Sequence, residues 1–592
     1  MRTGWFGLLV CTAILATSGA SRAQGVASDT CPRPAIGSEV PEPADLRSTN
    51  GVLSVDLGYR NYKDAAGRIL YCYVYGDGSL SPNLRLNPGD TLILHLKNEL
   101  TDLGAPTEVS MPVHNAHAMA AHGDPCISGV MSATSTNLHF HGLTIPPVCH
   151  QDEVLRTSVQ PGDAPFEYRF KVPADEPPGL YWYHPHMHGF SKAQVLGGAS
   201  GALIVEGLEH ANSAASGLPE RVFVIRDEDL LNPTAAPSKS EPVVPKMLVD
   251  RDGDTANTGT GSGRPAKDLS INYISVPYPD YTPAKIRMKP GEQQLWRVVN
   301  ASAITYLNLQ VYENHVAQMM GIVALDGVPV NANGAGPSVT VPRNHIGIPP
   351  GGRAEFIVKG PQAGGAALFV CRTVNTGAGG ENDPNRQLAL MVADPNAPEP
   401  RSTLATVLHA SPPPSLPWVG NMTPVRTRKL YFSETLQDPN DPNSPTTFYI
   451  TVDGQTPKVF DPNSDEPAIV ARQGDVEDWI IENRSKELHA FHIHQIHFLL
   501  TEWNGIPVNE PYLRDTINVP FMDDKSLGYP YVRVRMDFRD PNAIGTFVFH
   551  CHLLEHEDNG MMGLIRVDPA EQARGGAPGG AGGPMSKTLP SH

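Results

Sequence analysis

His550-Cys551-His552-Leu553-Leu554-Glu555-His556-Glu557-Asp558-Asn559-Gly560-Met561 is the stretch that decides the fold and chemistry of this chain. A thiolate at Cys551, an imidazole at His556 and a thioether at Met561 are three of the four ligands of a blue-copper centre. In such a centre two imidazoles and a thiolate bind in a plane and a methionine binds weakly along the axis. A second imidazole must therefore come from another part of the chain.

The two histidines that flank Cys551 predict a second metal centre. Neighbouring residues on a strand point to opposite faces of a sheet, so His550 and His552 cannot bind the same ion as Cys551. The second centre would be connected to the first through the backbone of Cys551. Taken alone, the stretch is also compatible with a structural cysteine or with half of a zinc site, and the rest of the chain decides between these interpretations.

An internal repeat predicts the domain organisation. A turn, a strand of alternating polarity and a final Asn occur at residues 88–98, 290–300 and 473–483, and a closing strand follows at 179–184, 365–371 and 545–550. Repeats of this kind predict tandem domains of one fold. Many short Val-, Ile-, Thr- and Tyr-rich runs, separated by 55 Gly and 57 Pro, favour β-structure. We therefore expect an all-β chain of three β-sandwich domains at 32–207, 220–395 and 400–569.

The two ends of the chain are predicted to lie outside these domains. Residues 1–23 combine a basic Arg2, an apolar segment from Phe6 to Ala16 and a Ser21-Arg22-Ala23 cleavage site, which is typical of a secretory signal peptide. Residues 570–592 are rich in Gly and Pro without an apolar period, which predicts a disordered tail. No later apolar run is long enough to span a bilayer. We expect a secreted or periplasmic protein.

Charge and cysteine content narrow the partners and the compartment. A formal net charge of −17 without a basic patch argues against nucleic acid or an anionic membrane as a partner. One of the seven cysteines, Cys11, lies in the signal peptide. If Cys551 binds a metal, the remaining five would fit two disulfides and one free buried thiol in an oxidising compartment. These five are Cys31, Cys72, Cys126, Cys149 and Cys371, and their pairing cannot be read from the sequence.

Three further histidine clusters lie at the ends of predicted strands. They are His139-Phe140-His141, His184-Pro185-His186 and His489-Ala490-Phe491-His492-Ile493-His494. In His-x-His on a strand both imidazoles lie on one face, which suits metal binding. The clusters occupy matching points of the first and third repeats. The middle repeat closes instead on Cys371-Arg372-Thr373, so we expect it to act as a spacer without copper.

With these four motifs and three repeats, the chain to about Val567 resembles the three-domain multicopper oxidases, the laccase family. The resemblance implies three cupredoxin-like Greek-key β-sandwich domains and four copper ions, one of type 1, one of type 2 and a type 3 pair. It assigns His489, Cys551 and His556 to type 1 copper, with Met561 axial, and His139 and His492 to type 2 copper. It assigns the type 3 pair to His141, His184, His186, His494, His550 and His552, between domains 1 and 3.

The resemblance also implies the reaction. A secreted enzyme would take single electrons from phenols or aromatic amines near His556 and pass them through Cys551, so that four electrons reduce O₂ to two waters. Family members use acids near two of the motifs as proton donors. The matching residues are Glu557, directly after His556, and Asp152, which lies farther from His141 than the family pattern has it. The partners would be O₂ and small organic electron donors, and we expect a monomer.

Other functions share parts of this pattern. A cuprous oxidase for copper detoxification would carry the same four motifs. Such members of the family typically carry a methionine-rich segment ahead of the His489 cluster, whereas Met422 is the single methionine between Glu399 and Leu488. A copper-free relative would have lost ligands, and none is lost; a two-domain nitrite reductase would not have three repeats. We expect oxidation of organic donors, with cuprous oxidation as the alternative.

Overall fold

The computed structural model describes residue 1 and residues 31–104, 123–236, 264–402, 416–438, 444–523 and 526–570. Within these ranges the chain forms strands β1 to β36 and only three short α-helices, which confirms the predicted all-β class. The predicted signal peptide at 1–23, apart from Met1, and the predicted tail at 570–592, apart from Ala570, lie outside the described residues. No helix of the described ranges is long and apolar enough to cross a membrane.

The first pair of sheets has the strand orders β1-β5-β10-β9-β7 and β4-β3-β2-β6-β8. Burial alternates along β6, so one face of the strand packs in the core that both sheets share. The helix α1 (Ser191–Leu196) follows β9, and α2 (Leu208–Ala211) follows β10. The strands are β1 (Asp45–Arg47), β2 (Val52–Lys63), β3 (Ile69–Tyr75), β4 (Ser79–Leu80), β5 (Asn83–Leu86), β6 (Thr91–Asn98), β7 (His139–His141), β8 (Phe166–Lys171), β9 (Gly179–His184) and β10 (Gly201–Val205).

The second pair of sheets has the orders β13-β12-β11-β15-β22-β18-β19 and β14-β24-β23-β16-β17, with β20, β21 and β25 paired at the side. Its core is centred on Trp296, which contacts Phe223 and Phe369 edge to face. The strands are β11 (Pro219–Glu228), β12 (Asp268–Ile271), β13 (Ile274–Val276), β14 (Ala284–Met288), β15 (Gln293–Asn300), β16 (Leu307–Glu313), β17 (Val316–Ala317), β18 (Met320–Leu325), β19 (Val328–Pro329), β20 (Val341–Arg343), β21 (Ile346–Ile348), β22 (Arg353–Lys359), β23 (Ala366–Cys371), β24 (Arg386–Ala393) and β25 (Arg401–Ser402).

The third pair has the orders β27-β26-β29-β34-β31-β32 and β28-β36-β35-β30-β33. The helix α3 (Leu554–Asp558) connects β35 to β36. The strands are β26 (Arg426–Leu436), β27 (Thr446–Val452), β28 (Ile469–Arg472), β29 (Val476–Asn483), β30 (His489–Ile493), β31 (Phe498–Trp503), β32 (Ile506–Pro507), β33 (Thr516–Val519), β34 (Tyr531–Asp537), β35 (Gly545–Cys551) and β36 (Met562–Asp568). The three sheet pairs are named the first, second and third units below, and the domain limits predicted from sequence stay predictions.

The internal repeat is visible in the strand pairing. The repeated strand has one parallel and one antiparallel neighbour in every unit. β6 lies between β2 (parallel) and β8 (antiparallel). In the same way β15 lies between β11 and β22, and β29 lies between β26 and β34. The Asn that ends each repeated strand has the same role in all three units. Asn98, Asn300 and Asn483 each accept a hydrogen bond from the backbone N–H two residues on and donate to two backbone carbonyls. An Asn side chain therefore turns the chain where each strand ends.

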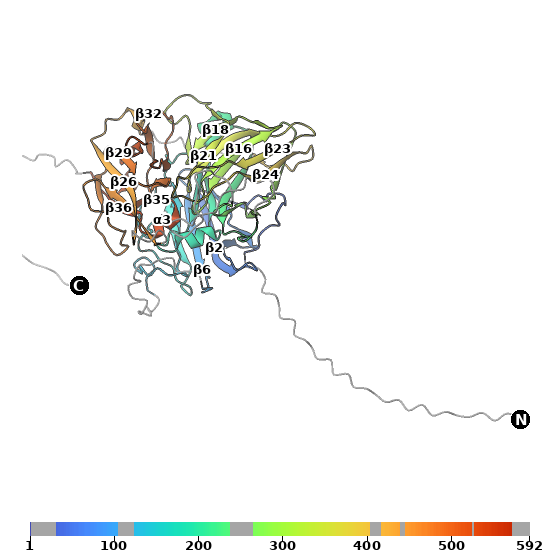
Figure 1. Ribbon diagram of the computed structural model, residues 1–592, viewed down its shortest axis with the longest axis horizontal. Coiled ribbons are helices and arrows are strands. Elements are labelled where there is room, and N and C mark those ends of the chain that lie inside the picture. The colour runs from blue at the N-terminus through green and yellow to red at the C-terminus, as the bar shows by residue number, and fades with distance from the viewer. Residues whose placement is uncertain are drawn as a thin grey trace, which may run out of the picture.

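The three units meet around α1 and α3, and α3 is labelled near the middle of the molecule in Figure 1. The carboxylate of Asp558 in the third unit accepts hydrogen bonds from the backbone N–H groups of Gly189, Ser191 and Lys192 in the first unit. The buried ammonium of Lys192 also pairs with Glu555. Between the first and second units, buried Arg85 and Arg297 both pair with Glu220. Hydrogen-bonded charges of this kind fix how the units are oriented.

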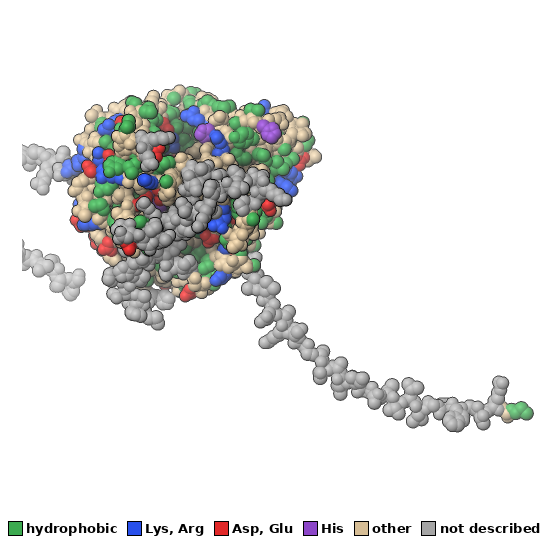
Figure 2. Space-filling model, in the orientation of Figure 1, with side chains coloured by type: hydrophobic (Ala, Val, Ile, Leu, Met, Phe, Trp, Pro, Cys, Tyr) green, Lys and Arg blue, Asp and Glu red, His purple; other side chains and the backbone are tan. Residues whose placement is uncertain are grey.

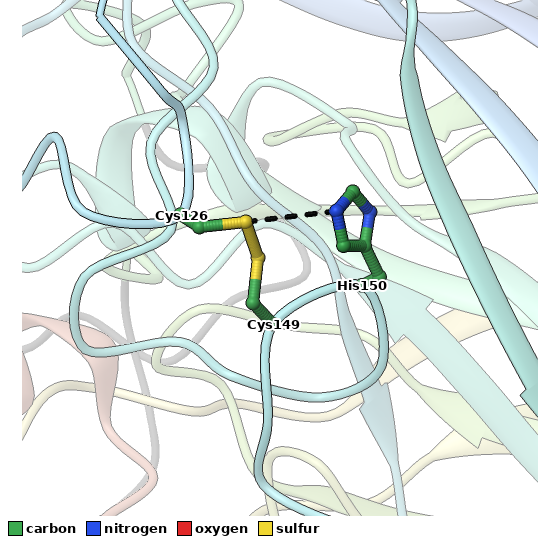
Figure 3. Close-up of side chains that lie close together, drawn as sticks. All are labelled: Cys126, Cys149 and His150. Carbon is green, nitrogen blue, oxygen red and sulfur yellow. Dashed lines mark hydrogen bonds between the residues drawn. A yellow bond between two sulfur atoms is a disulfide. The ribbon is translucent and has the colours of Figure 1, made fainter. Parts of the chain in front are cut away.

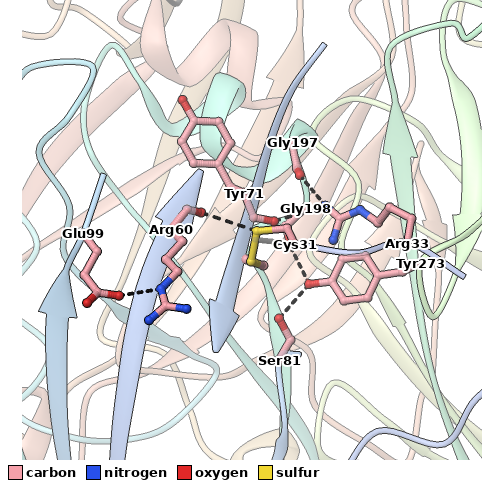
Figure 4. The surroundings of a disulfide bond; sticks show 10 residues. Cys31, Arg33, Arg60, Tyr71, Ser81, Glu99, Gly197, Gly198 and Tyr273 are labelled. Atoms are coloured by element: carbon pink, nitrogen blue, oxygen red, sulfur yellow. Dashed lines mark hydrogen bonds and ion pairs between the residues drawn. A yellow bond between two sulfur atoms is a disulfide. The ribbon is translucent and has the colours of Figure 1, made fainter. Parts of the chain in front are cut away.

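The cysteines form the predicted two disulfides and leave one free buried thiol besides Cys551. Cys31 is bonded to Cys72 and Cys126 to Cys149, whereas Cys371 and Cys551 are free and buried. Figure 4 shows that the first disulfide lies beside Arg33, whose guanidinium donates to the carbonyls of Tyr71 and Gly197. Acidic and basic side chains are mixed on the face of the molecule that Figure 2 shows.

Candidate metal centres

A cluster of one thiol and two imidazoles lies within the third unit. His489 begins β30, Cys551 ends β35 and His556 lies in α3, and all three side chains are buried. The Sγ atom of Cys551 is 3.5 Å from His489 Nδ1 and 3.7 Å from His556 Nδ1, and the two Nδ1 atoms are 3.2 Å apart. The structure thus brings the predicted residues together, with three ligand atoms facing one point. We name this group the mononuclear cluster.

The loop after α3 holds Met561 against the same cluster. Its backbone N–H donates to His556 O at 2.8 Å, and its carbonyl accepts from Cys551 N–H at 3.1 Å. The side chain is buried. A soft thioether, a thiolate and two imidazoles are the donor set that copper favours in an electron-transfer site.

The outer atoms of both imidazoles contact carboxylates that sequence analysis missed. His489 Nε2 donates to Glu434 Oε1 at 3.1 Å and lies 2.9 Å from Ser485 Oγ. His556 Nε2 is 3.3 Å from Glu487 Oε1. These contacts leave each Nδ1 directed at the sulfur, because a partner at one ring nitrogen fixes the tautomer and the orientation of the ring. Glu487 lies two residues before His489, which could have flagged it, whereas Glu434 has no sequence signal.

The other eight predicted histidines form a second buried cluster between the first and third units. They are His139, His141, His184, His186, His492, His494, His550 and His552. Strand register places them, since His139 pairs with His184 and His492 pairs with His550. The Nε2 atoms of His186 and His494 are 3.4 Å and 3.3 Å from His550 Nε2, so both units contribute to one three-nitrogen group. We name these eight residues the histidine cluster.

Most of these imidazoles have one nitrogen held and the other directed inward. His139 Nδ1, His184 Nδ1 and His492 Nδ1 donate to Asp152, Pro185 O and Asp515 O. Their Nε2 atoms are buried and have no hydrogen-bond partner among the described residues. Buried polar atoms are rarely left in this state unless a ligand completes them. The residues present therefore fit a bound metal.

Burial also sets the protonation that a metal requires. Desolvation lowers the pKa of His139 and of His550 to about 3, and it lowers that of His489 to about 4. An imidazolium has no free lone pair, so only a neutral imidazole binds a metal. Burial lowers the pKa of the other six members of the histidine cluster as well. At neutral pH all eight, together with His489, are thus in the form that binds copper.

The second unit reaches the histidine cluster through Arg353. This buried guanidinium donates to both carboxylate oxygens of Asp515, each at 2.6 Å. Asp515 in turn accepts from His141 Nε2 at 3.2 Å through its carboxylate, and from His492 Nδ1 at 2.9 Å through its backbone carbonyl. Next to it in the second unit, Gly351 lies so close to His552 that a Cβ there would be 2.6 Å from the imidazole. The unit predicted to be a spacer thus orients three histidines.

The two predicted acids lie at the histidine cluster. Glu557 Oε2 is 3.1 Å from His550 Nδ1 and its Oε1 is 3.6 Å from His186 Nε2. Asp152 accepts from His139 Nδ1 and from the backbone N–H of Phe140. Both carboxyls are buried, and desolvation raises the pKa of each well above its ordinary value.

Two more features bear on function. A pocket of about 420 Å³ lies beside Leu488, directly before His489, and its lining includes Trp503, Phe521 and Asn518. At the surface, Cys126, Cys149 and His150 also lie close together, but Figure 3 shows the two sulfur atoms joined in a disulfide, with His150 Nε2 3.7 Å from Cys126 Sγ. A disulfide has no thiolate to offer, so this third group is not a metal site in the oxidised protein.

Comparison with known proteins identifies the chain. Models of the multicopper oxidase family match residues 130–210, 228–396 and 439–571. Multicopper oxidase mco of Staphylococcus haemolyticus is 23% identical over 89% of this chain and 91% of its own, and a protein named laccase from Haloferax volcanii is 25% identical over 82% and 76%. The crystallised multicopper oxidase of Campylobacter jejuni, described as a metallo-oxidase, superposes with a TM-score of 0.59 at 21% identity, covering 90% of this chain and 96% of its own. This chain, whose three β-sandwich units have the cupredoxin-like fold, belongs to the multicopper oxidase family.

Proposed function

We propose that this protein is an exported laccase-like oxidase that couples one-electron oxidation of phenols or aromatic amines to the reduction of O₂ to water, with four bound copper ions. One observation carries the proposal. A mononuclear Cys-His₂ cluster and a cluster of eight neutral histidines are both buried, and they are joined by the three consecutive residues His550, Cys551 and His552. Bound copper supplies the one-electron redox chemistry that amino-acid side chains lack.

We assign the ligands as the resemblance to the family implies, and the two clusters support this assignment. His489, Cys551, His556 and Met561 would hold the type 1 ion. His139 and His492 would hold the type 2 ion, and the remaining six residues of the histidine cluster would hold the type 3 pair. His550 Nδ1 also donates to Cys551 O at 3.0 Å, which adds a hydrogen bond to the covalent connection between the clusters. The connection is therefore short and fixed.

Glu557 and Asp152 would hold the protons that O₂ reduction consumes. Their carboxyls contact His550 and His139, and neither forms an ion pair with a lysine or arginine of the described chain. A buried carboxyl without a cation keeps its proton at neutral pH and can deliver it where charge develops.

The pocket beside Leu488 supports an aromatic donor. Trp503 and Phe521 supply aromatic surface, and the buried Oδ1 of Asn518 has no partner among the described residues, so it could accept a phenol O–H or an aniline N–H. The two disulfides support export to an oxidising compartment.

Glu434 and Glu487 favour a second candidate, oxidation of a reducing metal cation such as Cu(I). Both carboxylates contact the outer nitrogens of the type 1 histidines, and a negative charge at that point would attract a cation.

The two candidates predict different effects of Glu434→Gln and Glu487→Gln. If the donor is organic, the rate of phenol oxidation by each variant should stay within about two-fold of the wild-type rate. If the donor is a cation, the rate of Cu(I) oxidation should fall at least about tenfold.

Cys551→Ser tests the proposed function itself. A hydroxyl is a poor ligand for this copper, so the copper-loaded variant should lose the intense blue absorption and stop consuming O₂ with methoxyphenols, aromatic amines or Cu(I) as donors. The histidine cluster is untouched and should still bind copper. A variant that remained blue would show that the type 1 site lies elsewhere, and a wild-type protein that consumed no O₂ with any of these donors would refute the function.

A further inference from the structure

A pocket of about 390 Å³ lies where the three units meet, separate from the pocket beside Leu488. Its lining includes Glu176 from the first unit, Asn331 from the second, and Trp418 and Gln495 from the third. Five prolines also line it, so its walls have little conformational freedom. At about 30 Å³ for each water molecule, the pocket has room for on the order of ten.

Gln495 separates this pocket from the histidine cluster. It directly follows His494, its side chain is 2% exposed, and its Nε2 donates to Asp152 Oδ2 at 2.5 Å. Asp152 in turn holds His139, so the amide is two hydrogen bonds from a predicted type 2 ligand. The other amide atom, Oε1, is buried without a hydrogen-bond partner among the described residues. A carbonyl oxygen in this state is a site for a donor that is not part of the chain, such as water.

The backbone conformation at Gln495 indicates that its side chain is needed at this position. Gln495 has a φ of +58°, in the left-handed region that is strained for a residue with a Cβ. Glycine would adopt this conformation without that strain, yet the chain carries a side chain here.

Glu176 is the buried carboxyl on the opposite unit of the same pocket. It is 3% exposed, and its oxygens accept weak hydrogen bonds of 3.2 and 3.4 Å from the backbone N–H of Thr144. No lysine, arginine or histidine of the described residues lies within ion-pair distance. Burial, reinforced by the charges of Asp540 and Asp175 and opposed by hydrogen bonding from Thr144 and from Tyr181, raises the pKa of Glu176 to about 8, so it is protonated at neutral pH.

The other charged groups of the pocket are engaged elsewhere. Arg539 is paired with Asp537, and the Nε2 of His497 donates to Asp326 O at 3.0 Å. Burial lowers the pKa of His497, so this imidazole is neutral. Asp175 is exposed and Asp540 is half-buried. Of the titratable groups that line the pocket, Glu176 is therefore the one that combines burial with a proton to release.

We propose that Glu176 supplies protons through this pocket to the type 2 side of the histidine cluster, and that Gln495 Oε1 positions the last water beside Asp152. In each step Glu176 releases one proton to the pocket water and regains one from bulk solvent; no electron moves and no covalent bond between heavy atoms changes. The inference rests on the proposed function, because O₂ reduction is what consumes the protons.

Glu176→Gln is the central test, since it keeps the shape and the neutral state of the side chain but removes the proton. The copper-loaded protein is reduced without O₂, mixed with O₂, and followed by the return of blue absorption between pH 6 and 9. Wild-type reoxidation should slow as the pH rises through about 8. The variant should be slower by roughly tenfold or more at pH 6 to 7 and lack that pH dependence. Asp175→Asn is the matched control, because it removes an exposed carboxylate from the same pocket but leaves Glu176. It should reoxidise at the wild-type rate at pH 6 to 7 and keep the pH dependence, with the midpoint moved to lower pH because one charge that raises the pKa of Glu176 is gone.

Two further readouts do not depend on turnover. The infrared spectrum of the wild type should contain the C=O stretching band of a protonated carboxyl that disappears with a midpoint near pH 8 and is absent from Glu176→Gln. Gln495→Gly removes the amide and relieves the left-handed backbone, so it should retain the copper content and blue colour of the wild type while reoxidation slows. Equal reoxidation rates and pH profiles in wild type and Glu176→Gln would overturn the inference, as would an infrared band that Glu176→Gln leaves unchanged. A wild type that neither turns blue nor consumes O₂ would refute the proposed function first, so the two failures are distinguishable.

Discussion

Glu557 has the two properties that a proton donor at the histidine cluster needs. Its carboxyl is fully buried, and one oxygen lies 3.1 Å from His550 Nδ1. Asp558, the next residue, directs its own carboxylate to the backbone of Gly189, Ser191 and Lys192 instead. The adjacent acids of α3 therefore have different contacts: Glu557 lies at the histidine cluster, and Asp558 binds the backbone of the first unit.

Glu557→Gln should therefore slow O₂ reduction without affecting electron uptake. The amide has the same shape but cannot deliver a proton, and general acids typically contribute about 10²-fold or more. Reduction of the type 1 site by a phenol in the absence of O₂ should proceed at the wild-type rate, while the return of blue absorption on mixing with O₂ should slow by roughly 10²-fold. Unchanged reoxidation would remove Glu557 from the mechanism.

Met561 sets the reduction potential if its thioether is the axial ligand. A thioether donates weakly to the oxidised ion, so its presence implies a moderate rather than high potential. Met561→Leu removes that donation at nearly constant volume and should raise the potential, which can be measured by redox titration of the blue absorption. A lower potential would show that Met561 is not axial, and Met562 would then be the residue to test.

The residues that form the two clusters were predictable from sequence, and the groups that orient them were not. His-x-His and His-Cys-His carry a chemical signature, because few other functions need imidazoles and a thiolate at these spacings. Asp515, Arg353 and Glu434 are ordinary charged residues in sequence. Asp515 and Arg353 acquire their roles only when strands of different units meet, and Glu434 acquires its role when the two sheets of the third unit pack together. The longer spacing between His141 and Asp152 did not prevent Asp152 from reaching His139.

At the scale of elements, the repeat in the sequence predicted the architecture. The turn, alternating strand and final Asn are local features, and they fold into the equivalent strands β6, β15 and β29. Strand pairing is not local, however, and neither is the contact between units. The contribution of β22 to the histidine cluster could not be predicted, since its first residue, Arg353, acts on a side chain 162 positions away.

Arg353→Met tests that contribution. It leaves the carboxylate of Asp515 buried without its cation, and breaking a buried ion pair in this way costs about 3–5 kcal/mol. The free energy of unfolding should fall by that order, and the histidine cluster should retain less copper while the type 1 absorption persists. Arg353→Lys is the matched control: it keeps the charge but not the paired hydrogen bonds, so its loss should be smaller. If Arg353→Met retained the copper content of the wild type, β22 would contribute to the stability of the fold but not to copper binding.

At the scale of the whole molecule, the two clusters differ in what they connect. The mononuclear cluster draws all its residues from the third unit, with His489, Cys551 and His556 on β30, β35 and α3. The histidine cluster combines residues such as His186 of the first unit with His494 and His550 of the third. Copper at the second cluster would therefore hold two units together, whereas copper at the first would stabilise one unit internally.

Copper removal should accordingly lower both the stability of the protein and the cooperativity between units. A ligand present at 1,000 times its Kd stabilises the folded state by about 4 kcal/mol. By calorimetry, the copper-loaded wild type should unfold in one transition at a higher Tm than the copper-free protein, in which the first and third units should begin to unfold separately. His186→Ala removes a predicted ligand from the cluster between the units, so its copper-loaded form should resemble the copper-free wild type. Cys551→Ser alters the mononuclear cluster alone and should retain the single transition. If His186→Ala also kept the single transition, the units would be held together by direct contacts such as those of Asp558, and copper would contribute only to the stability of each unit.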